Sequence, residues 1–398
     1  MSEEPYRIAV MLPRYSTYGG VERFGCRVAA ELARRGHKVD FICARQEIEA
    51  GPGVNIMAVG RPKANKRVKM TVFANRADAL LECGDYDCAI SLGKTLHQDI
   101  MRVGGAPLRE FWRYSEQAFQ PGLRRWLKRL RRRLDPANRL TLEIEERQYA
   151  SGCKIVAVSH FVRDLIVRAH PHLKAEDIQV IYNKPDLQSF RPPSAEENRE
   201  ARRSFRVPDG AMAIGLATSN FLLKGTGPLI RSLNLLPGNF RLYVAGGRGH
   251  AQYDKLAARL KVADRVHFLG RVDDMPRFFQ AMDIFALPTF YDACANSVLE
   301  ALAAGLPVLS SASNGSSYFL PEKNIVQDPG DPEELSYILL DLANEAEASR
   351  DRGRRPVFAW PDNVKLGVES FADMVEAFLA EKGRLEDREP FKLSPDPV

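Results

Sequence analysis

The sequence predicts an α/β protein with two parallel, doubly wound sheets. Three observations lead to this prediction. Short apolar runs alternate with segments of helical spacing, the alternation starts again near residue 211, and the chain has 398 residues, which is too long for one ordinary hydrophobic core. Regular alternation of strands and helices favours parallel sheets with helices on both faces.

The first half opens with a strand, a helix and a second strand. Residues 7–13 are an apolar run typical of a buried strand, apolar residues recur at helical spacing from Val21 to Leu32, and residues 37–43 form the next apolar run. This is the order of a βαβ unit. Further strands are predicted at 54–59, 88–92 and 154–159.

The second half repeats the pattern, after an expected linker at residues 183–193. Its predicted strands are 213–217, 240–245, 266–270, 284–288 and 307–310. Its predicted helices are 229–236, 251–262, 275–282, 297–304 and 332–345. Two Rossmann-like halves of this kind bind ligands beyond the carboxyl ends of their strands.

Composition narrows the class of protein. Hydrophobic residues make up 45% and charged residues 27%, which are values of a globular domain. The formal net charge of +6 is concentrated at residues 124–133, which favours one local anionic partner over general nucleic-acid binding. Six scattered cysteines without a C-x-x-C pair favour free thiols, and we find no secretory signal or membrane span, so a cytoplasmic protein is expected.

The most informative stretch is residues 287–307. It places Asp292 and Glu300 around a predicted helix start, between a buried strand and a Gly-Leu-Pro turn. Loop N–H groups and a helix N-terminus can hold phosphate, and the carboxylates can accept hydroxyl protons. The layout suits a phosphorylated, hydroxyl-rich ligand. The alternatives are a hydrolase acid pair, or a helix-terminal acid with a solvated glutamate, although Glu300 lies in an apolar setting where a charge needs partners.

Two glycine-containing turns follow strands. Gly19 and Gly20 precede the first helix, where backbone can approach an anionic ligand. Lys224 stands beside Gly225 after the first strand of the second half, and a lysine there suits a diphosphate. Each also fits a plain turn, with Lys224 as a surface lysine.

Two other motifs are weaker. Asp85-Tyr86-Asp87 resembles a metal-binding D-x-D, but it precedes its strand and so faces the wrong end of the sheet. Gly93-Lys94-Thr95 resembles the end of a phosphate-binding loop, but Cys88 occupies the position of the required first glycine. No zinc-type spacing is present either, so we expect no metal and no cofactor.

Residues 123–134 predict a basic amphipathic helix. One face carries leucines and Trp126. The other carries the cationic residues Arg124, Arg125, Lys128, Arg129, Arg131, Arg132 and Arg133. Such a helix suits an anionic membrane surface or a phosphorylated lipid acceptor. The alternative is a surface helix packed on the core by its leucines.

With these motifs in hand, the chain resembles the GT-B retaining glycosyltransferases of family 4 over roughly residues 6–380, and looks closest to the lipopolysaccharide core glucosyltransferase I branch. The motifs that carry the family resemblance are residues 19–23, 156–161, 224–225, 268–271 and the block 292–308. The branch rests on Gly93-Lys94 with Asp99, the segment leading into Tyr114, and the helix at 142–149.

The resemblance implies a domain plan. Two Rossmann-like domains would face each other across a cleft. Residues 1–185 would form an acceptor domain, residues 186–358 a nucleotide-sugar donor domain, and residues 359–381 a C-terminal helix that crosses back to the first domain. Residues 382–398, rich in proline and charge, are expected to be a disordered tail.

The resemblance also implies residue roles. Glu300 would hold the ribose hydroxyls of a nucleotide, Asp292 the hydroxyls of the donor sugar, and Lys224 the departing diphosphate. Gly19 and Gly20 would lie close to the phosphates. The remaining expectations are backbone amides from Ala295 and Asn296, an acceptor-orienting Asp99, a hinge position for Asn183, and acceptor or membrane contacts from Arg124, Arg125, Trp126, Lys128, Arg129 and Arg132.

Two positions depart from the family pattern. The first acid is usually Glu and here is Asp292, which shortens its reach by one methylene. The usual basic partner of the lysine is missing, because Thr218 and Leu223 occupy the likely positions. Donor choice and rate are therefore expected to differ more than the fold.

The predicted function is metal-independent transfer of a hexose, with retention, to a lipopolysaccharide-core or other lipid-linked glycan acceptor. The expected donor is UDP-glucose, and the expected location is the inner face of the cytoplasmic membrane. Two alternatives stay open: a nucleotide-sugar epimerase of the same fold, which needs no acceptor, and a non-catalytic, membrane-associated nucleotide-sugar-binding protein. The sequence leaves the oligomeric state open.

Overall fold

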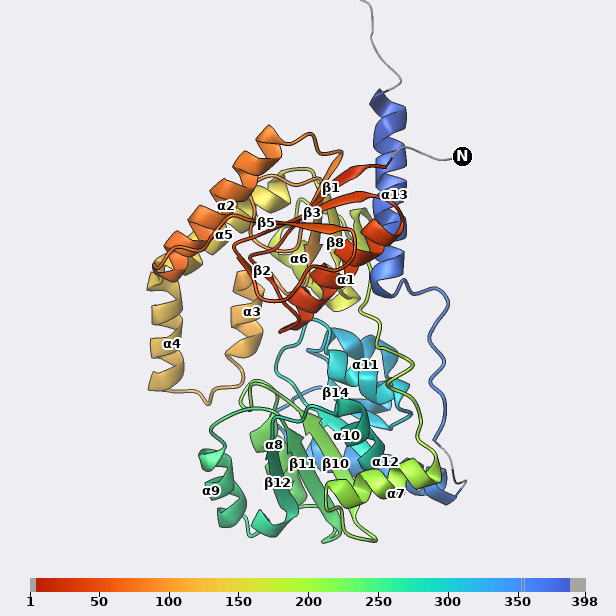
Figure 1. The fold of residues 1–398 in the computed structure, drawn as a ribbon. Coiled ribbons are helices and arrows are strands. Elements are labelled where there is room, and N and C mark those ends of the chain that lie inside the picture. The colour runs from red at the N-terminus through yellow and green to blue at the C-terminus, as the bar shows by residue number, and fades with distance from the viewer. Residues whose placement is uncertain (1–4, 352, 354, 387–398) are drawn as a thin grey trace, which may run out of the picture. The chain divides into compact units, whose positions relative to one another are not determined.

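The computed structural model describes residues 5–351, 353 and 355–386 (Figure 1). The chain packs as two compact units. One contains the residues up to Arg102, Glu143–Val156 and the residues from Lys365 onward; the other contains Val103–Leu142 and Ala157–Val364. Most of the predicted tail, residues 387–398, lies outside the described residues.

The larger sheet has seven strands in the order β5-β3-β1-β6-β7-β8-β9. In chain order the strands are β1 (Arg7–Met11), β3 (Lys38–Cys43), β5 (Val54–Ala58), β6 (Cys88–Ser91), β7 (Ile100–Val103), β8 (Lys154–Ala157) and β9 (Ile178–Val180). β1 runs parallel to both of its neighbours, with Ile8 opposite Val39 and Cys88. Ile8 and Val10 are fully buried, as expected for a central parallel strand covered on both faces.

Helices of the first unit include α1 (Gly20–Arg34), α2 (Lys66–Cys83) and α13 (Gly367–Glu386). α13 runs beside α1 (Figure 1). Phe371 meets Phe24 edge-on with ring centroids 5.4 Å apart, and Arg35 forms ion pairs with Asp373 and Glu376. The last helix is therefore fastened to the first by an aromatic contact and a charged cluster. α13 also continues past residue 381, where the tail was expected to begin.

The second sheet has six strands in the order β12-β11-β10-β13-β14-β15. They are β10 (Met212–Ala217), β11 (Phe240–Ala245), β12 (Val266–Gly270), β13 (Ile284–Leu287), β14 (Val308–Ser311) and β15 (Ile325–Val326), and every pairing is parallel. The helices that follow its strands or join them include α8 (Thr226–Leu233), α9 (Ala251–Arg259), α10 (Met275–Ala281), α11 (Asn296–Ala303) and α12 (Pro332–Asp351). This is the predicted doubly wound order.

Four more helices lie in the second unit, in addition to those that join the strands of its sheet. They are α3 (Leu108–Ser115), α4 (Leu123–Leu134), α6 (His160–Ala169) and α7 (Ala195–Ser204). α5 (Pro136–Ala150) follows α4 directly. The expected linker at residues 183–193 carries no helix or strand. Short strands β2 (Arg14–Tyr15) and β4 (Arg45–Gln46) pair separately from both sheets.

Replacing Phe371 with alanine is expected to lower the free energy of unfolding by roughly 3–5 kcal/mol, because a fully buried phenyl ring would leave a cavity beside Phe24. Chemical denaturation measures this change. Tyr18→Ala, in the same unit but 78% exposed, is the control and should change stability by about 0.5 kcal/mol or less. Equal effects from the two variants would show that α13 does not stabilise the first unit.

Candidate active site

Loops follow the carboxyl ends of four neighbouring strands in the second sheet, and two of these loops carry the predicted site residues Lys224 and Asp292. Lys224 follows β10, Gly246 follows β11, Asp292 follows β13 and Asn314 follows β14. Because all of these strands are parallel, their carboxyl ends meet at one edge of the sheet. Open α/β sheets bind ligands at this edge, which is therefore called the ligand edge.

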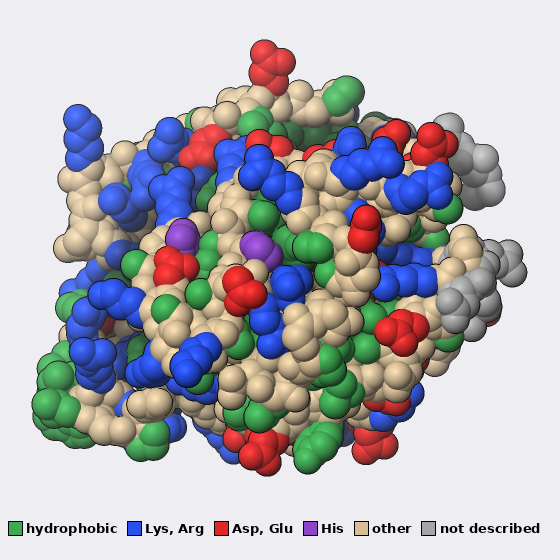
Figure 2. Space-filling view, turned by 90° about the horizontal axis from the view of Figure 1, so that it is seen from below, with side chains coloured by type: hydrophobic (Ala, Val, Ile, Leu, Met, Phe, Trp, Pro, Cys, Tyr) green, Lys and Arg blue, Asp and Glu red, His purple; other side chains and the backbone are tan. Residues whose placement is uncertain are grey.

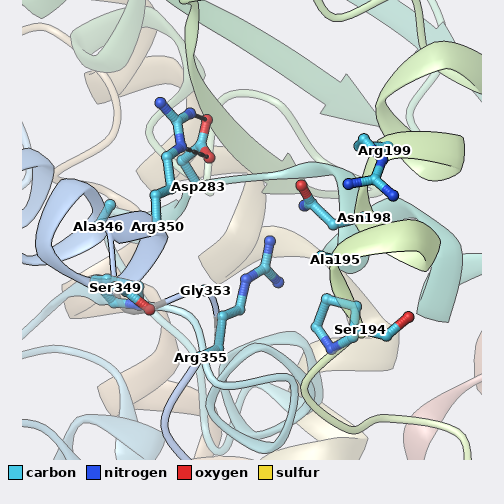
Figure 3. Close-up of a pocket in the computed structure, with 12 residues that line it drawn as sticks. Ser194, Ala195, Asn198, Arg199, Asp283, Ala346, Ser349, Arg350, Gly353 and Arg355 are labelled. Atoms are coloured by element: carbon cyan, nitrogen blue, oxygen red, sulfur yellow. Dashed lines mark hydrogen bonds and ion pairs between the residues drawn. The ribbon is translucent and has the colours of Figure 1, made fainter.

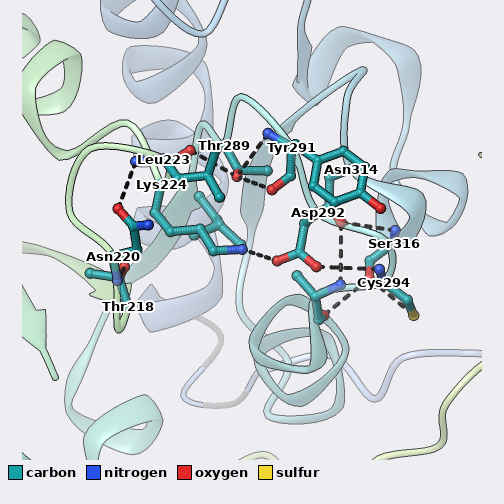
Figure 4. Close-up of polar contacts among 12 residues, drawn as sticks. Thr218, Asn220, Leu223, Lys224, Thr289, Tyr291, Asp292, Cys294, Asn314 and Ser316 are labelled. Atoms are coloured by element: carbon teal, nitrogen blue, oxygen red, sulfur yellow. Dashed lines mark hydrogen bonds and ion pairs between the residues drawn. The ribbon is translucent and has the colours of Figure 1, made fainter. Parts of the chain in front are cut away.

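Lys224 and Asp292 form an ion pair across two of these loops (Figure 4). Their side chains are only 17% and 19% exposed. Gly225 makes this geometry possible: its φ is +72°, and a Cβ at this position would collide with the carbonyl oxygen of Pro288. The structure therefore brings together the two charged residues that the sequence placed 68 positions apart.

The backbones of the two loops are also joined. Phe290 N donates to the Leu223 carbonyl at 2.8 Å, and Thr289 Oγ1 lies 3.1 Å from the same oxygen. Thr289 Oγ1 also donates to the Tyr291 carbonyl at 2.9 Å. The Leu223 carbonyl thus holds the 288–296 loop against the loop after β10. These bonds fix the backbone from which the side chains of Lys224 and Asp292 extend.

Asn314, 2% exposed, organises the other end of the 288–296 loop. Its Oδ1 accepts from Ala295 N at 3.2 Å and from Ser316 N at 3.1 Å, and its Nδ2 donates to Ser310 Oγ at 2.9 Å. The Ala295 amide is therefore engaged within the protein, whereas the sequence suggested it for a ligand. Asp292 Oδ1 in turn accepts from Cys294 N at 3.3 Å.

α11 starts directly after this loop, with Ala295 as its N-cap and no side chain capping it. Val298, Leu299, Ala301 and Leu302 are buried around Glu300, which is itself only partly exposed. Glu300 therefore stands on the short helix that begins at the ligand edge, one turn beyond its first residues.

Gly19 and Gly20 lie in the first unit, after β1, and both are exposed. Gly19 has a φ of +121° and is the N-cap of α1 without a side-chain cap. The first turn of α1 therefore begins without a side-chain cap, and its use for an anionic ligand stays a prediction.

Asp99 lies beside the first sheet. It directly precedes β7, its Oδ2 accepts from Ala89 N at 2.7 Å, and Lys382 of α13 approaches its Oδ1 at 3.5 Å. Its carbonyl also accepts from Lys154 N at the start of β8. This is the amino-terminal edge of the first sheet, so Asp99 ties strand starts together and is not grouped with the ligand-edge residues.

The basic helix forms where it was predicted, and none of its residues is buried. Trp126 is 57% exposed, and Leu123 and Leu134 are 70% and 57% exposed, so the leucine face is not packed on the core. In Figure 2, Lys and Arg side chains gather along the left margin with hydrophobic side chains beside them, on the side where α4 lies in Figure 1.

Part of the basic face is used within the protein. Arg129 and Arg132 pair with Glu116, at 2.6 and 3.4 Å. The Lys128 ammonium lies 3.6 Å from the Phe119 ring centroid, and burial lowers the pKa of Lys128 to about 8. Arg124 and Trp126 stay at the surface. Of the six residues predicted for acceptor or membrane contact, Lys128, Arg129 and Arg132 thus contact other parts of the protein, and Arg124 and Trp126 lie at the surface.

A cavity of about 240 Å³ lies at the opposite, amino-terminal edge of the second sheet (Figure 3). Asp283, just before β13, pairs there with Arg202 and Arg350, both at its Oδ2. Arg355 donates to the carbonyls of Phe279, Gln280 and Met282 at the end of α10. These arginines satisfy backbone and carboxylate oxygens, and Arg355 is thereby fastened to the end of α10.

No three His, Cys, Asp or Glu side chains come together as a possible metal site in the part of the chain that the structure describes. Nor does any helix within those residues have a stretch that is both long and apolar enough to span a bilayer.

Asp87 of the D-x-D sequence accepts from Arg7 N at 2.7 Å, at the start of β1.

Fold, site and family models together define the class of protein. A model described as Glycosyltransferase Family 4 matches residues 18–189, and one described as Glycosyl transferases group 1 matches residues 213–345. The chain therefore belongs to the glycosyltransferases that these models describe, and its two Rossmann-like parallel sheets give it the GT-B architecture.

Individual glycosyltransferases are also similar to the chain in sequence and fold. The chain is 23% identical to the lipopolysaccharide glucosyltransferase WaaG of Escherichia coli (strain K12) over 372 residues, which cover 90% of this chain and 93% of that one. The crystal structure of WaaG superposes with a TM-score of 0.74 at 20% identity, over 92% of this chain and 99% of that chain. The structure of Anabaena Alr3699/HepE in complex with UDP and glucose gives a TM-score of 0.64 at 15% identity, over 94% and 99% of the two chains.

Sequence reasoning missed two residues of this site. Asn314 follows a predicted strand in an Asn-Gly pair, and this position at the ligand edge could have drawn attention to it. Tyr291 is buried beside Asp292, with its hydroxyl accepting from Ala106 N. The sequence gave no sign of that contact, because it joins positions 185 apart.

Asn314→Ala is expected to destabilise the second unit by roughly 2–6 kcal/mol, because the amides of Ala295 and Ser316 would lose their acceptor in a buried setting at about 1–3 kcal/mol each. Denaturation of the variant measures the loss. Asn234→Ala, at an exposed helix end, is the control and should cost about 0.5 kcal/mol or less. A neutral Asn314→Ala would mean that this side chain does not organise the 288–296 loop.

Proposed function

We propose that this glycosyltransferase moves a hexose, glucose in the first instance, from a UDP-linked donor to a lipopolysaccharide-core or other lipid-linked glycan, with retention and without a metal ion. The observation that carries the proposal is the Lys224–Asp292 pair at the ligand edge of the second sheet. The relation to WaaG and the UDP and glucose held by Alr3699/HepE support the choice of donor and acceptor.

Lys224 would stabilise the charge that leaves with the diphosphate. An ammonium has three N–H donors, so Lys224 can keep one on Asp292 and direct others to phosphate oxygens. In a site that is largely closed to water, a fixed cation stabilises developing negative charge more strongly than it would in solution. The missing second basic residue, with Thr218 and Leu223 in its likely places, leaves this task mainly to Lys224 and backbone amides.

The other groups would grip the remaining parts of the donor. Glu300 would accept from ribose hydroxyls, and Asp292 would accept from hydroxyls of the sugar. Gly19 and Gly20 would let the first turn of α1 approach the phosphates, where the helix N-terminus favours negative charge. The acceptor hydroxyl would pass its proton to the leaving phosphate on the same face, so no side-chain nucleophile is required.

α4 would place the enzyme on the inner face of the cytoplasmic membrane, next to a lipid-linked acceptor. Its exposed leucines and Trp126 can enter the headgroup boundary while its free arginines meet anionic lipids. This use explains why a face of a helix in a folded enzyme is left uncovered.

Lys224→Ala is expected to lower kcat on the order of 100-fold or more, because a preorganised charge at the leaving group is lost. Glu300→Gln should weaken UDP binding by roughly tenfold or more, since it removes a charged hydrogen-bond acceptor. Radiolabelled transfer from UDP-glucose measures the first effect and calorimetric titration with UDP the second. Lys255→Ala, exposed on α9, is the matched control and should behave as the unchanged enzyme.

Full transferase activity in Lys224→Ala, or unchanged UDP binding in Glu300→Gln, would contradict the site. Consumption of UDP-glucose without an acceptor, yielding an isomeric nucleotide sugar, would favour an epimerase. Tight UDP binding without turnover in the unchanged protein would indicate a non-catalytic binding protein.

Replacing three exposed arginines of α4, Arg124, Arg131 and Arg133, with glutamine is expected to weaken binding to phosphatidylglycerol-containing vesicles on the order of 100-fold, at about 1 kcal/mol per charge. Vesicle co-sedimentation at low salt measures the binding. The control removes three exposed charges near the start of α2 instead, at Lys63, Lys66 and Arg67. Equal losses in both triple variants would indicate unspecific attraction and leave α4 a structural helix.

A further inference from the structure

The 288–296 loop is held by residues from an earlier part of the chain, all within the second unit. Three hydrogen bonds come from this earlier part: Ala106 N to Tyr291 Oη at 2.5 Å, Ser159 Oγ to the Ala293 carbonyl at 2.7 Å, and Asn183 Nδ2 to Asn296 Oδ1 at 2.7 Å. Of these, only the Tyr291 contact involves a side chain directly adjacent to Asp292.

Tyr291 lies in an aromatic cluster. Phe111 meets its ring edge-on at 5.3 Å, and Tyr114 and Phe161 lie 6.3 and 6.2 Å from it. The residue is 7% exposed, and burial raises the pKa of its hydroxyl. Phe111 and Tyr114 belong to α3, so the short segment of residues 104–116 rests on Tyr291 both by its rings and by the Ala106 amide.

The same segment is fastened to the basic helix. Arg132 Nη2 donates to Ser115 Oγ at 2.9 Å, Arg132 Nη1 to the Trp112 carbonyl at 3.3 Å, and Arg129 pairs with Glu116 at 2.6 Å. Glu116 is 8% exposed and the Arg132 side chain 13% exposed, so the ion pair between these two residues is largely shielded from water and strengthened, whereas Arg129 is half-exposed. A continuous set of contacts therefore runs from α4 through residues 104–116 to Tyr291.

We infer that Tyr291 is a positioning residue that couples the 104–116 segment, and through it the basic helix α4, to the sugar-binding carboxylate of Asp292. The inference rests on the proposed function. With the segment seated on Tyr291, Asp292 is held in place for transfer; with the segment displaced, the 288–296 loop loses the contact next to Asp292.

Two physical consequences follow. Binding of the nucleotide relies on Glu300 and Lys224, whose positions depend on α11 and the Leu223 carbonyl, so nucleotide affinity should not depend on Tyr291. Orientation of the sugar relies on Asp292, and displacing a reacting group by about 1 Å can cost on the order of 100-fold in rate. Tyr291 should therefore govern kcat and the fate of the donor rather than the dissociation constant of UDP.

The test compares Tyr291→Phe and Tyr291→Ala in the full-length enzyme. Tyr291→Phe keeps the ring and removes only the bond to Ala106 N, so transfer to acceptor should fall about fivefold. Tyr291→Ala also removes the aromatic contacts and should lower transfer on the order of 100-fold. In both, the dissociation constant of UDP should stay within about twofold, and the share of UDP-glucose lost to water instead of acceptor should rise.

Tyr243→Phe is the matched control, because it removes a hydroxyl from another buried tyrosine in the same unit, on β11. It should leave both the transfer rate and the share of hydrolysis unchanged. The link to α4 is tested by combining Tyr291→Phe with Arg132→Gln. Coupled residues give a double variant whose loss differs from the product of the single losses, whereas independent residues give that product.

The outcomes separate this inference from the proposed function. If the unchanged enzyme neither binds UDP nor transfers glucose, the proposed function fails first. If it transfers normally and Tyr291→Phe and Tyr291→Ala keep its rate and its low hydrolysis, only the coupling by Tyr291 is wrong. A parallel loss of UDP binding in Tyr291→Phe would also overturn it, because that result indicates general damage to the site.

Discussion

The ion pair between Lys224 and Asp292 is the interaction on which the site depends. It joins the loop after β10 to the loop after β13, and the Leu223 carbonyl joins the same two loops through backbone. A lysine and an aspartate that are both more than four-fifths buried stabilise each other, because an unpaired charge there would be costly. The pair therefore keeps a cation and a carboxylate ready at the ligand edge.

Around this pair, buried polar groups form hydrogen bonds within the chain. Asn314 holds the Ala295 amide, Ser159 holds the Ala293 carbonyl, and Thr289 holds its neighbours. Because these groups bond one another, Lys224 and Asp292 stand on a backbone that is tied in several places. A small set of ligand groups on a rigid backbone is the arrangement that orientation-driven catalysis requires.

Much of the fold could be predicted from the sequence, because its periodicity is strong. β11 and β12 have the predicted bounds, and the basic helix begins and ends at Leu123 and Leu134 as expected. α2 was not predicted, since its apolar residues do not recur on one face, and α3 was not predicted either, although it is as long as α8 and α11. The same holds for the candidate site, where some residues could be predicted from the sequence and others could not. Asp292, Glu300 and Lys224 sit in recognisable local motifs, whereas Tyr291 acquires its role from Ala106 and Phe111, which lie far away in the chain. Asp99 looked like a site residue by motif, yet it precedes its strand's start, and only the strand order shows that it lies at the wrong edge.

The central claim is that Lys224 meets the diphosphate and Asp292 meets the sugar of one bound donor. A crystal structure of the enzyme with UDP and a non-hydrolysable UDP-glucose analogue tests this most directly. The account predicts Lys224 Nζ at hydrogen-bond distance, about 2.7–3.2 Å, from a phosphate oxygen, with Asp292 on a sugar hydroxyl and Glu300 on the ribose. A donor bound with its phosphates away from Lys224, or seated in the arginine-lined cavity at the opposite edge of the sheet, would contradict it.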